Sequence, residues 1–389
     1  MSQFIIQRQR SIKLGHYNVI TPTLWLGHDL DHQVRVWQRL PHCPGVMLNA
    51  YQLFSMPILR ERAAKEGLHN LLGYQGPIFL DSGGFLFQRD GESKITAEEL
   101  LSLYDQLKPD IAAILDVPLN PLESTSVNHR RWRATLKNTE FMFQNNGSVV
   151  LAPVFHAYQL DVIKPRQAQL QRITSNPPFI CIGSLVPLLK ASYIGRLFRQ
   201  GDYDLSPTLQ RWRFITRLIL KVRCLYPTSI VHVFGVGSLS TMYLLYALGV
   251  DSVDSLSWRL KAAYGEILLP GLSNRCMKPR RSATRVRRTL RDKDIDLLLQ
   301  CQCPACDHRT IEERVKILSD SFVARATHNA YVFLYELESI KAAIKARALS
   351  QLVTEKLEES SLFRRVVYSI ILPELEKCSE DHEKYLEEA

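Results

Sequence analysis

The sequence has 389 residues, enough for one large barrel or two ordinary domains, and its 46% hydrophobic and 23% charged residues argue against a disordered chain. It has no apolar run close to the ~20 residues that a membrane-spanning helix needs, and its N-terminus lacks the apolar core and cleavage site of a signal peptide. The formal net charge of +10 favours a polyanionic partner, and we expect a cytoplasmic protein without a membrane partner.

Short apolar runs alternate with longer helical patterns over the first three-quarters of the chain. The runs are rich in Ile, Val, Leu and Phe and are too short for typical helices, so we predict strands there. The clear ones cover residues 46–50, 77–83, 111–117, 149–155, 179–186 and 230–237, and a last short one covers residues 251–255. Helical patterns between them include residues 96–107 and 209–225.

This alternation predicts an α/β fold whose parallel strands are buried on both faces. About eight strand–helix units close into a TIM (β/α)8 barrel, and an open doubly wound sheet is the competing architecture. Several apolar runs end in polar residues or glycine, at positions that would share one face of a barrel. These residues are Asp81, Asp116, Ser184, Gly237 and Asp254. The sequence therefore favours the barrel, with the active site at this face.

The composition divides the chain into three predicted parts. Residues 1–275 would form the barrel, which is the catalytic core. Residues 276–335 are first strongly basic and then rich in cysteine, which predicts a basic and zinc-binding subdomain. Residues 336–389 would form a C-terminal helical tail, a candidate surface for a homodimer.

Cys301, Cys303 and Cys306 form a compact thiolate cluster, and His328 follows after a helical segment. Three cysteines and one histidine make a closed tetrahedral set, which is typical of structural rather than catalytic Zn2+. His308 is a rival fourth ligand, but it follows Cys306 so closely that a tetrahedron is harder to close. The remaining five of the eight cysteines are scattered, which favours a reducing cytoplasm over a disulfide scaffold.

Carboxylates at the ends of predicted strands are the main catalytic candidates. Asp81 is followed by two glycines, which allow a ligand to approach the backbone closely, and Asp116 lies near the end of another run. Asp251 and Asp254 are three residues apart, so an extended segment directs them to opposite faces and at most one faces the barrel mouth. Converging carboxylates fit either a metal site or substitution at a sugar carbon, with one carboxylate as nucleophile and another handling protons.

Two stretches concentrate the positive charge. One contains Arg130, Arg131 and Arg133, and the other runs from residue 278 to residue 291 without an acidic residue. The second stretch is predicted to contact nucleic acid. The residues expected to do so are Arg280, Arg281, Arg285, Arg287 and Arg288. No Walker loop or G-x-G-x-x-G motif indicates a nucleotide cofactor.

Taken together, the motifs resemble the tRNA-guanine transglycosylase family over residues 18–329. The matching segments are NVITPTLWL (18–26), LNAYQL (48–53), DSGGF (81–85), IGSLVPLL (182–189), VHVFGVGS (231–238) and ALGVDSVDS (247–255). Cys301, Cys303, Cys306 and His328 match the family's zinc ligands in type and order. The resemblance implies a zinc-containing TIM barrel that exchanges a base in nucleic acid through a covalent aspartyl–sugar intermediate.

Carried over by position, the resemblance implies roles for individual residues. Asp254 would be the nucleophile that attacks C1′ of a guanosine unit, and Asp81 would be the general acid/base for the departing and incoming bases. Asp116 would accept hydrogen bonds from the exocyclic amine and ring N–H of the base, which suits an acceptor-only carboxylate. The other base-binding candidates are Ser82, Ser184 and Leu185, of which the last two would offer backbone groups, and Tyr51, a candidate stacking surface.

The sequence departs from the family's pattern near the base. Residues 154–157 read Val-Phe-His-Ala where the family usually has Val-Gln-Gly-Gly, so the glutamine that touches the base is missing. His156 either substitutes for it or is structural, and the sequence leaves both open. Ser184 stands where the family has the second glycine of its Gly-Gly-Leu segment. Arg259 and Lys261 follow the predicted nucleophile as candidate contacts to the nucleic-acid backbone.

These departures make the sequence resemble the family's DNA-acting branch more than its tRNA branches. The bacterial loop that helps to read the anticodon is absent, and the roughly sixty residues after His328 are too few for the archaeal RNA-binding domains. We therefore predict DNA as substrate, a 7-deazaguanine such as preQ0 as the incoming base, and a DNA-modification system as the source of partner proteins. The alternatives are tRNA, a noncatalytic nucleic-acid-binding subunit, and a metal-dependent barrel hydrolase, for which His156 and His232 are a weak ligand set.

Overall fold

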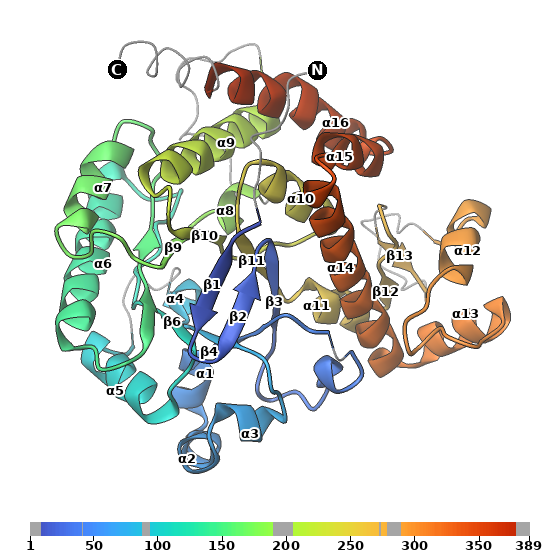
Figure 1. The fold of residues 1–389 in the computed structure, drawn as a ribbon, viewed down its shortest axis with the longest axis horizontal. Helices are drawn as coiled ribbons and strands as arrows, with labels where there is room; N and C mark the ends of the chain where they lie inside the picture. Colours follow the sequence, from blue (N-terminus) through green and yellow to red (C-terminus); the bar gives the residue numbers. More distant parts are fainter. Residues whose placement is uncertain are drawn as a thin grey trace.

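A computed structural model describes residues 9–40, 42–87, 94–189, 205–271, 274–277 and 289–378, and in it one parallel sheet lies inside a ring of helices (Figure 1). The strands of this sheet are β3 (Thr23–Gly27), β4 (Val46–Asn49), β5 (Ile78–Asp81), β6 (Ile111–Ala113), β7 (Val150–Ala152), β8 (Val154–Phe155), β9 (Phe179–Ile182), β10 (Ile230–Val233) and β11 (Ser252–Ser255). Each predicted run contains one of these strands, with β7 and β8 sharing a run. The strands end earlier than predicted, because the last residues of several runs form the loops at the barrel mouth.

The sheet closes on itself through residues 150–155. Its order is β7-β6-β5-β4-β3-β11-β10-β9-β8, and β7 and β8 are two parts of one stretch separated by Pro153. Proline has no N–H to donate, but the carbonyl of Pro153 accepts a hydrogen bond of 2.9 Å from the amide of Cys181 in β9. Counting β7 and β8 together, the nine strands occupy eight positions around a closed barrel. The predicted TIM (β/α)8 barrel is confirmed.

Helices follow the strands, and most of them cover the outside of the barrel. They are α1 (Ala50–Ser55), α2 (Pro57–Glu66), α3 (Leu68–Leu72), α4 (Gly84–Phe87), α5 (Ala97–Leu107), α6 (Thr125–Asn145), α7 (Ile163–Gln171), α8 (Val186–Leu189), α9 (Pro207–Leu225), α10 (Leu239–Ala247) and α11 (Ser257–Ala263), with the 3-10 helix η1 (Val36–Gln38). The helices predicted over residues 96–107 and 209–225 are α5 and α9. Reciprocal hydrogen bonds between Thr96 and Glu99 fix the start of α5.

Aromatic side chains fill the barrel interior below its mouth. The ring of Phe79 lies 5.4 Å from that of Trp25 and 6.2 Å from that of Phe179, measured between centroids. It also contacts the rings of His232 and Phe234. The interior is therefore a packed core and not a pore, as is usual in this fold.

A hairpin lies across the N-terminal end of the barrel (Figure 1). It consists of β1 (Ser11–Leu14) and β2 (Tyr17–Ile20), which pair antiparallel immediately before β3. Arg10 ties this end to the barrel, because its guanidinium donates a hydrogen bond of 2.6 Å to the carbonyl of Pro227, just before β10. Access for a ligand is left at the opposite end, where the strands finish.

The cysteine cluster belongs to a small lobe beside the barrel (Figure 1). The lobe contains the two-stranded sheet of β12 (Glu266–Ile267) and β13 (Arg275–Cys276) and the helices α12 (Asp292–Leu299) and α13 (Ile311–Asp320). It has a hydrophobic core of its own, in which Leu269, Leu298 and Leu318 meet the cysteines. The long helix α14 (Phe322–Lys345) connects this lobe to the barrel by packing against α11.

The C-terminal helices share the main core of the barrel. They are α15 (Leu349–Leu357), α16 (Ser361–Val366) and the π-helix η2 (Val367–Ile371). Val353, Leu357, Ile370 and Ile371 are buried in the same hydrophobic cluster as the barrel side chains. The predicted division between residues 335 and 336 falls inside α14, which is one continuous helix. Among the described helices, none combines the length and apolar character needed to span a bilayer.

Candidate active site

A cavity of about 380 Å³ lies at the carboxyl ends of the barrel strands, within the size range of ligand pockets. Asp81, Asp116, Ser184, Gly237 and Asp254 all line it, so their predicted convergence on one face is confirmed. The rest of its wall is largely apolar. These lining residues are Met47, Phe85, Pro118, Gly183, Val186, Pro187, Phe234, Gly235, Val236, Leu256, Ser257 and Leu260.

Asp254 lies in β11 and Asp251 directly precedes this strand. Their side chains point in opposite directions, as predicted. The Oδ1 atom of Asp254 accepts a hydrogen bond of 2.8 Å from the amide of Gly235, and His232 Nε2 lies 3.4 Å from the same oxygen. Asp251 is buried away from the cavity, where it pairs with Arg223 and accepts a hydrogen bond of 2.9 Å from the amide of Val231. Asp254 therefore faces the cavity, whereas Asp251 connects α9 to the barrel.

Asp81 ends β5 and its Oδ2 accepts a hydrogen bond of 3.2 Å from the amide of Gly83. Burial, followed by the negative charges of Asp116 and Asp254, raises the pKa of Asp81 to about 8. A carboxyl group with such a pKa keeps a proton at neutral pH and can both donate and accept it, which suits a general acid/base. The environment thus distinguishes Asp81 from the other two carboxylates in the cavity.

The two glycines of the DSGGF segment allow close packing beneath the cavity. Gly83 has φ of +87°, and a Cβ atom there would lie 2.7 Å from Cβ of Tyr51. A Cβ atom at Gly84 would lie 2.3 Å from Oδ1 of Asp116. Tyr51 is therefore packed behind this turn, and the predicted stacking surface is not among the residues that line the cavity.

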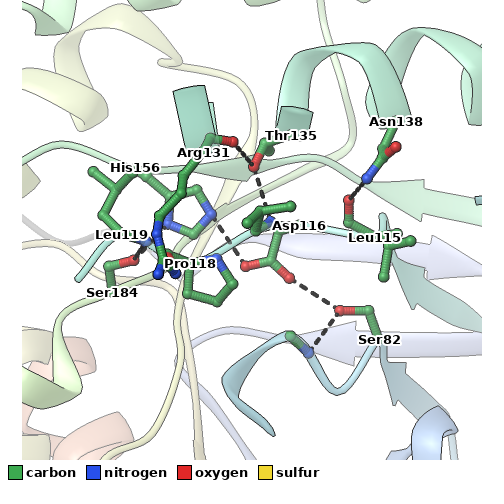
Figure 2. Close-up of polar contacts among 12 residues, drawn as sticks. Ser82, Leu115, Asp116, Pro118, Leu119, Arg131, Thr135, Asn138, His156 and Ser184 are labelled. Carbon is green, nitrogen blue, oxygen red and sulfur yellow. Dashed lines mark hydrogen bonds and ion pairs between the residues drawn. The ribbon is translucent and has the colours of Figure 1, made fainter. Parts of the chain in front are cut away.

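Both carboxylate oxygens of Asp116 face a buried side chain (Figure 2). Ser82 Oγ donates a hydrogen bond of 3.0 Å to Oδ1, and His156 Nε2 lies 3.1 Å from Oδ2. Ser82 and His156 are both fully buried and neither lines the cavity. Of the two roles left open for His156, the structure favours the supporting one, because Asp116 lies between its ring and the cavity wall.

One face of α6 fixes the segment that carries Asp116 (Figure 2). Arg131 donates a hydrogen bond of 2.9 Å to the carbonyl of Pro118, Thr135 Oγ1 accepts one of 2.9 Å from the amide of Val117, and Asn138 donates one of 2.9 Å to the carbonyl of Leu115. The helical spacing of these side chains places them on one side of α6. Arg131 is thus a structural residue and not a surface cation, while Arg130 and Arg133 are exposed.

Ser184 occupies a backbone position that favours glycine. Its φ is +65°, in the left-handed region, which explains why a glycine suits this place in the family's pattern. Its side chain offsets the strain, because Oγ accepts a hydrogen bond of 2.8 Å from the amide of Leu119 and lies 2.9 Å from His156 Nδ1. The side chain of the neighbouring Leu185 is buried and does not line the cavity, so the backbone contact expected for this residue stays a prediction.

The predicted contacts to nucleic acid fall into two groups. Arg259 is 8% exposed and pairs with Asp29, so its guanidinium is engaged inside the protein. Lys261 is half-buried and lies 3.0 Å from a carboxylate oxygen of Glu266. Both side chains thus have a carboxylate partner within the protein, and their contacts to nucleic acid stay predictions. The other predicted contacts, Arg280, Arg281, Arg285, Arg287 and Arg288, lie outside the described residues.

Phe85 is one of the lining residues that the sequence interpretation missed. Its side chain is 56% exposed although it is a large hydrophobic group at the cavity, where it offers an apolar face to a flat ligand. The available signal was its place in DSGGF, directly after the glycines. The apolar residues Val186, Phe234 and Leu260 were missed because, in the sequence, they look like ordinary apolar positions of a strand or helix.

The cysteine cluster forms a set of donors that can hold a metal ion. The ligand atoms of Cys301, Cys303, Cys306 and His328 all lie within 4.8 Å of one another. His328 Nε2 lies 2.9 Å from the carbonyl oxygen of Leu268, so this nitrogen carries the proton and leaves Nδ1 facing the three sulfur atoms. His308 is exposed, pairs with Asp307, and is not part of the cluster.

Comparison with known proteins identifies the family. Residues 7–361 match the profile of the queuine tRNA-ribosyltransferase family. The chain belongs to this family. The prediction made from DSGGF, the run into Asp254 and the Cys3His set is therefore confirmed at the level of the family.

Relatives of this chain within the family share about a quarter of its residues. They include proteins named tRNA-guanine(15) transglycosylase from Korarchaeum cryptofilum (26% identity; 80% of this chain and 48% of the relative), Thermococcus kodakarensis (28%; 80% and 48%) and Methanopyrus kandleri (29%; 79% and 60%). The chain spans about half the length of the first two. All three names refer to tRNA, so the expected likeness to a DNA-acting branch has no support from these relatives.

The raised pKa of Asp81 predicts a characteristic pH dependence of stability. The unfolded carboxyl ionises near pH 4 and the folded one near pH 8, so wild-type stability falls as pH rises between these values. Asp81→Asn removes this loss. We expect the variant to be more stable than wild type by a few kcal/mol, on the order of the linkage energy, at pH 9 and similar to it at pH 4 in urea denaturation. A stability difference that is the same at both pH values would contradict this assignment. Asp105→Asn, an exposed site on α5, is the control.

The polar face of α6 predicts a difference between two isosteric substitutions. Thr135→Val leaves the buried amide of Val117 without its acceptor, which should lower the free energy of unfolding by about 1–3 kcal/mol. Thr139→Val, on the same helix, removes only a hydrogen bond to a helix carbonyl that has its own helical partner, so we expect a loss below about 1 kcal/mol. Urea denaturation of both variants measures the difference. Equal losses would show that α6 does not fix the Asp116 segment in this way.

Proposed function

We propose that this protein is a pentosyltransferase that exchanges guanine in a nucleic acid for another purine-like base. The observation that carries the proposal is the unequal environment of three carboxylates in one cavity. Asp254 has one oxygen anchored by a backbone amide, Asp81 has a pKa raised to about 8, and Asp116 is fixed by Ser82 and His156. Nucleophile, acid/base and recognition group thus have different partners, as the exchange requires.

The reaction proceeds by two displacements at one sugar carbon. Asp254 Oδ2 attacks C1′ of the target nucleotide, the C1′–N9 bond breaks, and the departing guanine takes the proton of Asp81. The incoming base then returns a proton to Asp81 as its ring nitrogen attacks C1′ and the aspartyl–sugar bond breaks. Two inversions restore the original configuration, as in retaining glycosidases. After both displacements, Asp81 has regained its proton and Asp254 is again a free carboxylate.

Recognition of the base would combine one carboxylate with apolar walls. Asp116 accepts hydrogen bonds from the exocyclic amine and the ring N–H of guanine, since an ionised carboxylate has no competing donor. Phe85 and Val186 line the same cavity and can contact the faces of a flat ring. The target nucleotide must leave its stack to reach this depth.

The names of the relatives support tRNA as the nucleic acid. We therefore place tRNA first and keep DNA, which the sequence departures favoured, as the alternative. A 7-deazaguanine such as preQ0 is the proposed incoming base, because its ring keeps the amine and N–H that Asp116 would bind. The basic stretch at residues 278–291 supplies the proposed phosphate contacts.

We further propose that the Cys3His cluster holds a structural zinc ion. Three thiolates and one imidazole leave no open coordination position, which suits a structural and not a catalytic role. The ion would tie the loop at residues 301–306 to α14, and α14 packs against α11, which directly follows the strand of Asp254. Through these two helices, the ion would support the strand that carries Asp254.

An exchange assay tests the proposed function. Purified protein is incubated with radiolabelled guanine and either an unmodified tRNA transcript or duplex DNA. We expect label to enter tRNA, and Asp254→Asn to lower the rate by at least about 1,000-fold because the nucleophile is lost. Label in DNA alone would keep the chemistry and replace the substrate. Absence of label from both would overturn the proposed function. Asp105→Asn, an exposed carboxylate, is the matched control that should retain activity.

Metal analysis tests the zinc assignment. We expect about one zinc ion per chain in wild type and in Cys43→Ser, which alters a buried cysteine outside the cluster, but little zinc in Cys303→Ser. Removal of the ion should lower the melting temperature by roughly 5–10 °C, because binding free energy contributes to folding. Equal zinc content in both cysteine variants would contradict the assignment.

A further inference from the structure

A buried histidine lies directly beneath Asp254 and has no role in the mechanism above. Trp25 Nε1 is 2.7 Å from Ser252 Oγ, Ser252 Oγ is 2.9 Å from His232 Nδ1, and His232 Nε2 is 3.4 Å from Asp254 Oδ1. Trp25, Ser252 and His232 have no exposed surface. They come from β3, β11 and β10, whose register pairs Asp254 with Trp25 and His232 with Ser252.

The direction of the hydrogen bonds follows from the donors available. The indole N–H of Trp25 can only donate, so Ser252 Oγ accepts from it and has one proton of its own to give. Among the hydrogen bonds of the described residues, the remaining partner of this hydroxyl is His232 Nδ1. Nδ1 therefore accepts, and the ring proton lies on Nε2, the nitrogen that faces Asp254. The opposite tautomer would turn a bare nitrogen toward a carboxylate and leave the serine proton without an acceptor.

We propose that His232 is a positioning residue that directs its Nε2–H at Oδ1 of Asp254 and so leaves Oδ2 of this carboxylate to attack the sugar. This inference rests on the proposed function. The amide of Gly235 donates a hydrogen bond to the same Oδ1, and His232 Nε2 lies 3.4 Å from it without another hydrogen-bond partner among the described residues. A carboxylate held in this way cannot rotate freely, and its second oxygen keeps a fixed direction toward the cavity.

His232 is flanked by aromatic rings, and Asp254 is the carboxylate within ion-pair distance of it. The rings of Phe79 and Phe234 lie 5.2 and 4.6 Å from the imidazole and exclude water from it. Cys181, its register partner on β9, is the neighbouring titratable group, and burial raises the pKa of this thiol well above its usual range. The carboxylates of Asp81 and Asp116 face the same interior from β5 and from the segment after β6.

The same arrangement recurs at Asp116 (Figure 2). The amide of Leu119 donates to Ser184 Oγ, this oxygen lies 2.9 Å from His156 Nδ1, and His156 Nε2 lies 3.1 Å from Asp116 Oδ2. Two of the three cavity carboxylates are thus each backed by a serine-oriented histidine. Asp81 has a backbone amide in that position instead, and it is the carboxyl group whose pKa is raised. The buried histidines thus distinguish the surroundings of Asp116 and Asp254 from those of Asp81.

Two amide substitutions of different length test the role of His232. Gln can bring its amide N–H to the position of Nε2, whereas Asn reaches only to that of Nδ1. With the nucleic acid that wild type labels, we expect His232→Asn to lower the single-turnover exchange rate by about 10- to 100-fold, with KM for the nucleic acid changed less than about twofold. The acidic limb of its pH–rate profile should move to higher pH, since the ionised carboxylate has lost a donor. His232→Gln should regain most of the rate.

Two outcomes of these measurements would contradict a positioning role for His232. Equal losses in His232→Asn and His232→Gln at similar melting temperatures, or a change confined to KM, would reduce His232 to a packing residue. A second measurement does not depend on exchange activity. In protein labelled with 15N-histidine, we expect the His232 signal, assigned by its loss in His232→Gln, to show the neutral Nε2–H tautomer and to shift in Asp254→Asn. An Nδ1–H tautomer or an unchanged signal would overturn the proposal even if exchange itself were absent.

Discussion

Three carboxyl groups share a cavity of about 380 Å³, and the repulsion between their charges constrains everything built around them. The protein accommodates them by giving each a different set of partners. Asp116 and Asp254 each face a buried imidazole, and each accepts a hydrogen bond, Asp116 from the Ser82 hydroxyl and Asp254 from the amide of Gly235. Asp81 lacks such a histidine, and burial together with the charges of the other two carboxylates raises its pKa. That group is then the one able to move a proton.

The barrel makes this arrangement possible because its parallel strands all finish at one face. The parallel pairing of β6 with β7 brings His156 next to Asp116, although 40 positions separate them in sequence, and the pairing of β8 with β9 brings it next to Ser184. The polar face of α6 then fixes the Asp116 segment, and α11 and α14 connect the strand of Asp254 to the Cys3His cluster. The supporting elements are rigid helices and strands, so the carboxylates keep their separations without contacts among themselves.

Much of the fold and part of the site could be predicted from the sequence, because the deciding signals are local. Apolar runs of strand length predicted the barrel, and the three-residue spacing of Asp251 and Asp254 predicted that their side chains point in opposite directions. The Cys3His set was predicted from residue type and order. Contacts between strands were out of reach, since they depend on register. Local patterns could not show that Arg259 is buried against Asp29, nor that His232 lies under Asp254. The predicted boundary at residue 335 failed to anticipate that α14 starts at Phe322 and continues through it.

The departures from the family's pattern become understandable as one coupled change. Phe155 occupies the position of the missing glutamine and is buried against Trp132, so it adds no polar contact to the cavity. His156 and Ser184 replace two glycines, and their side chains contact each other behind Asp116. Ser184 keeps the left-handed backbone that a glycine would adopt freely. Its hydroxyl accepts a hydrogen bond from the amide of Leu119 and contacts His156 Nδ1. At the place where the family's pattern has a glutamine and two glycines, this chain thus has a buried pair of side chains that contacts Asp116 from behind.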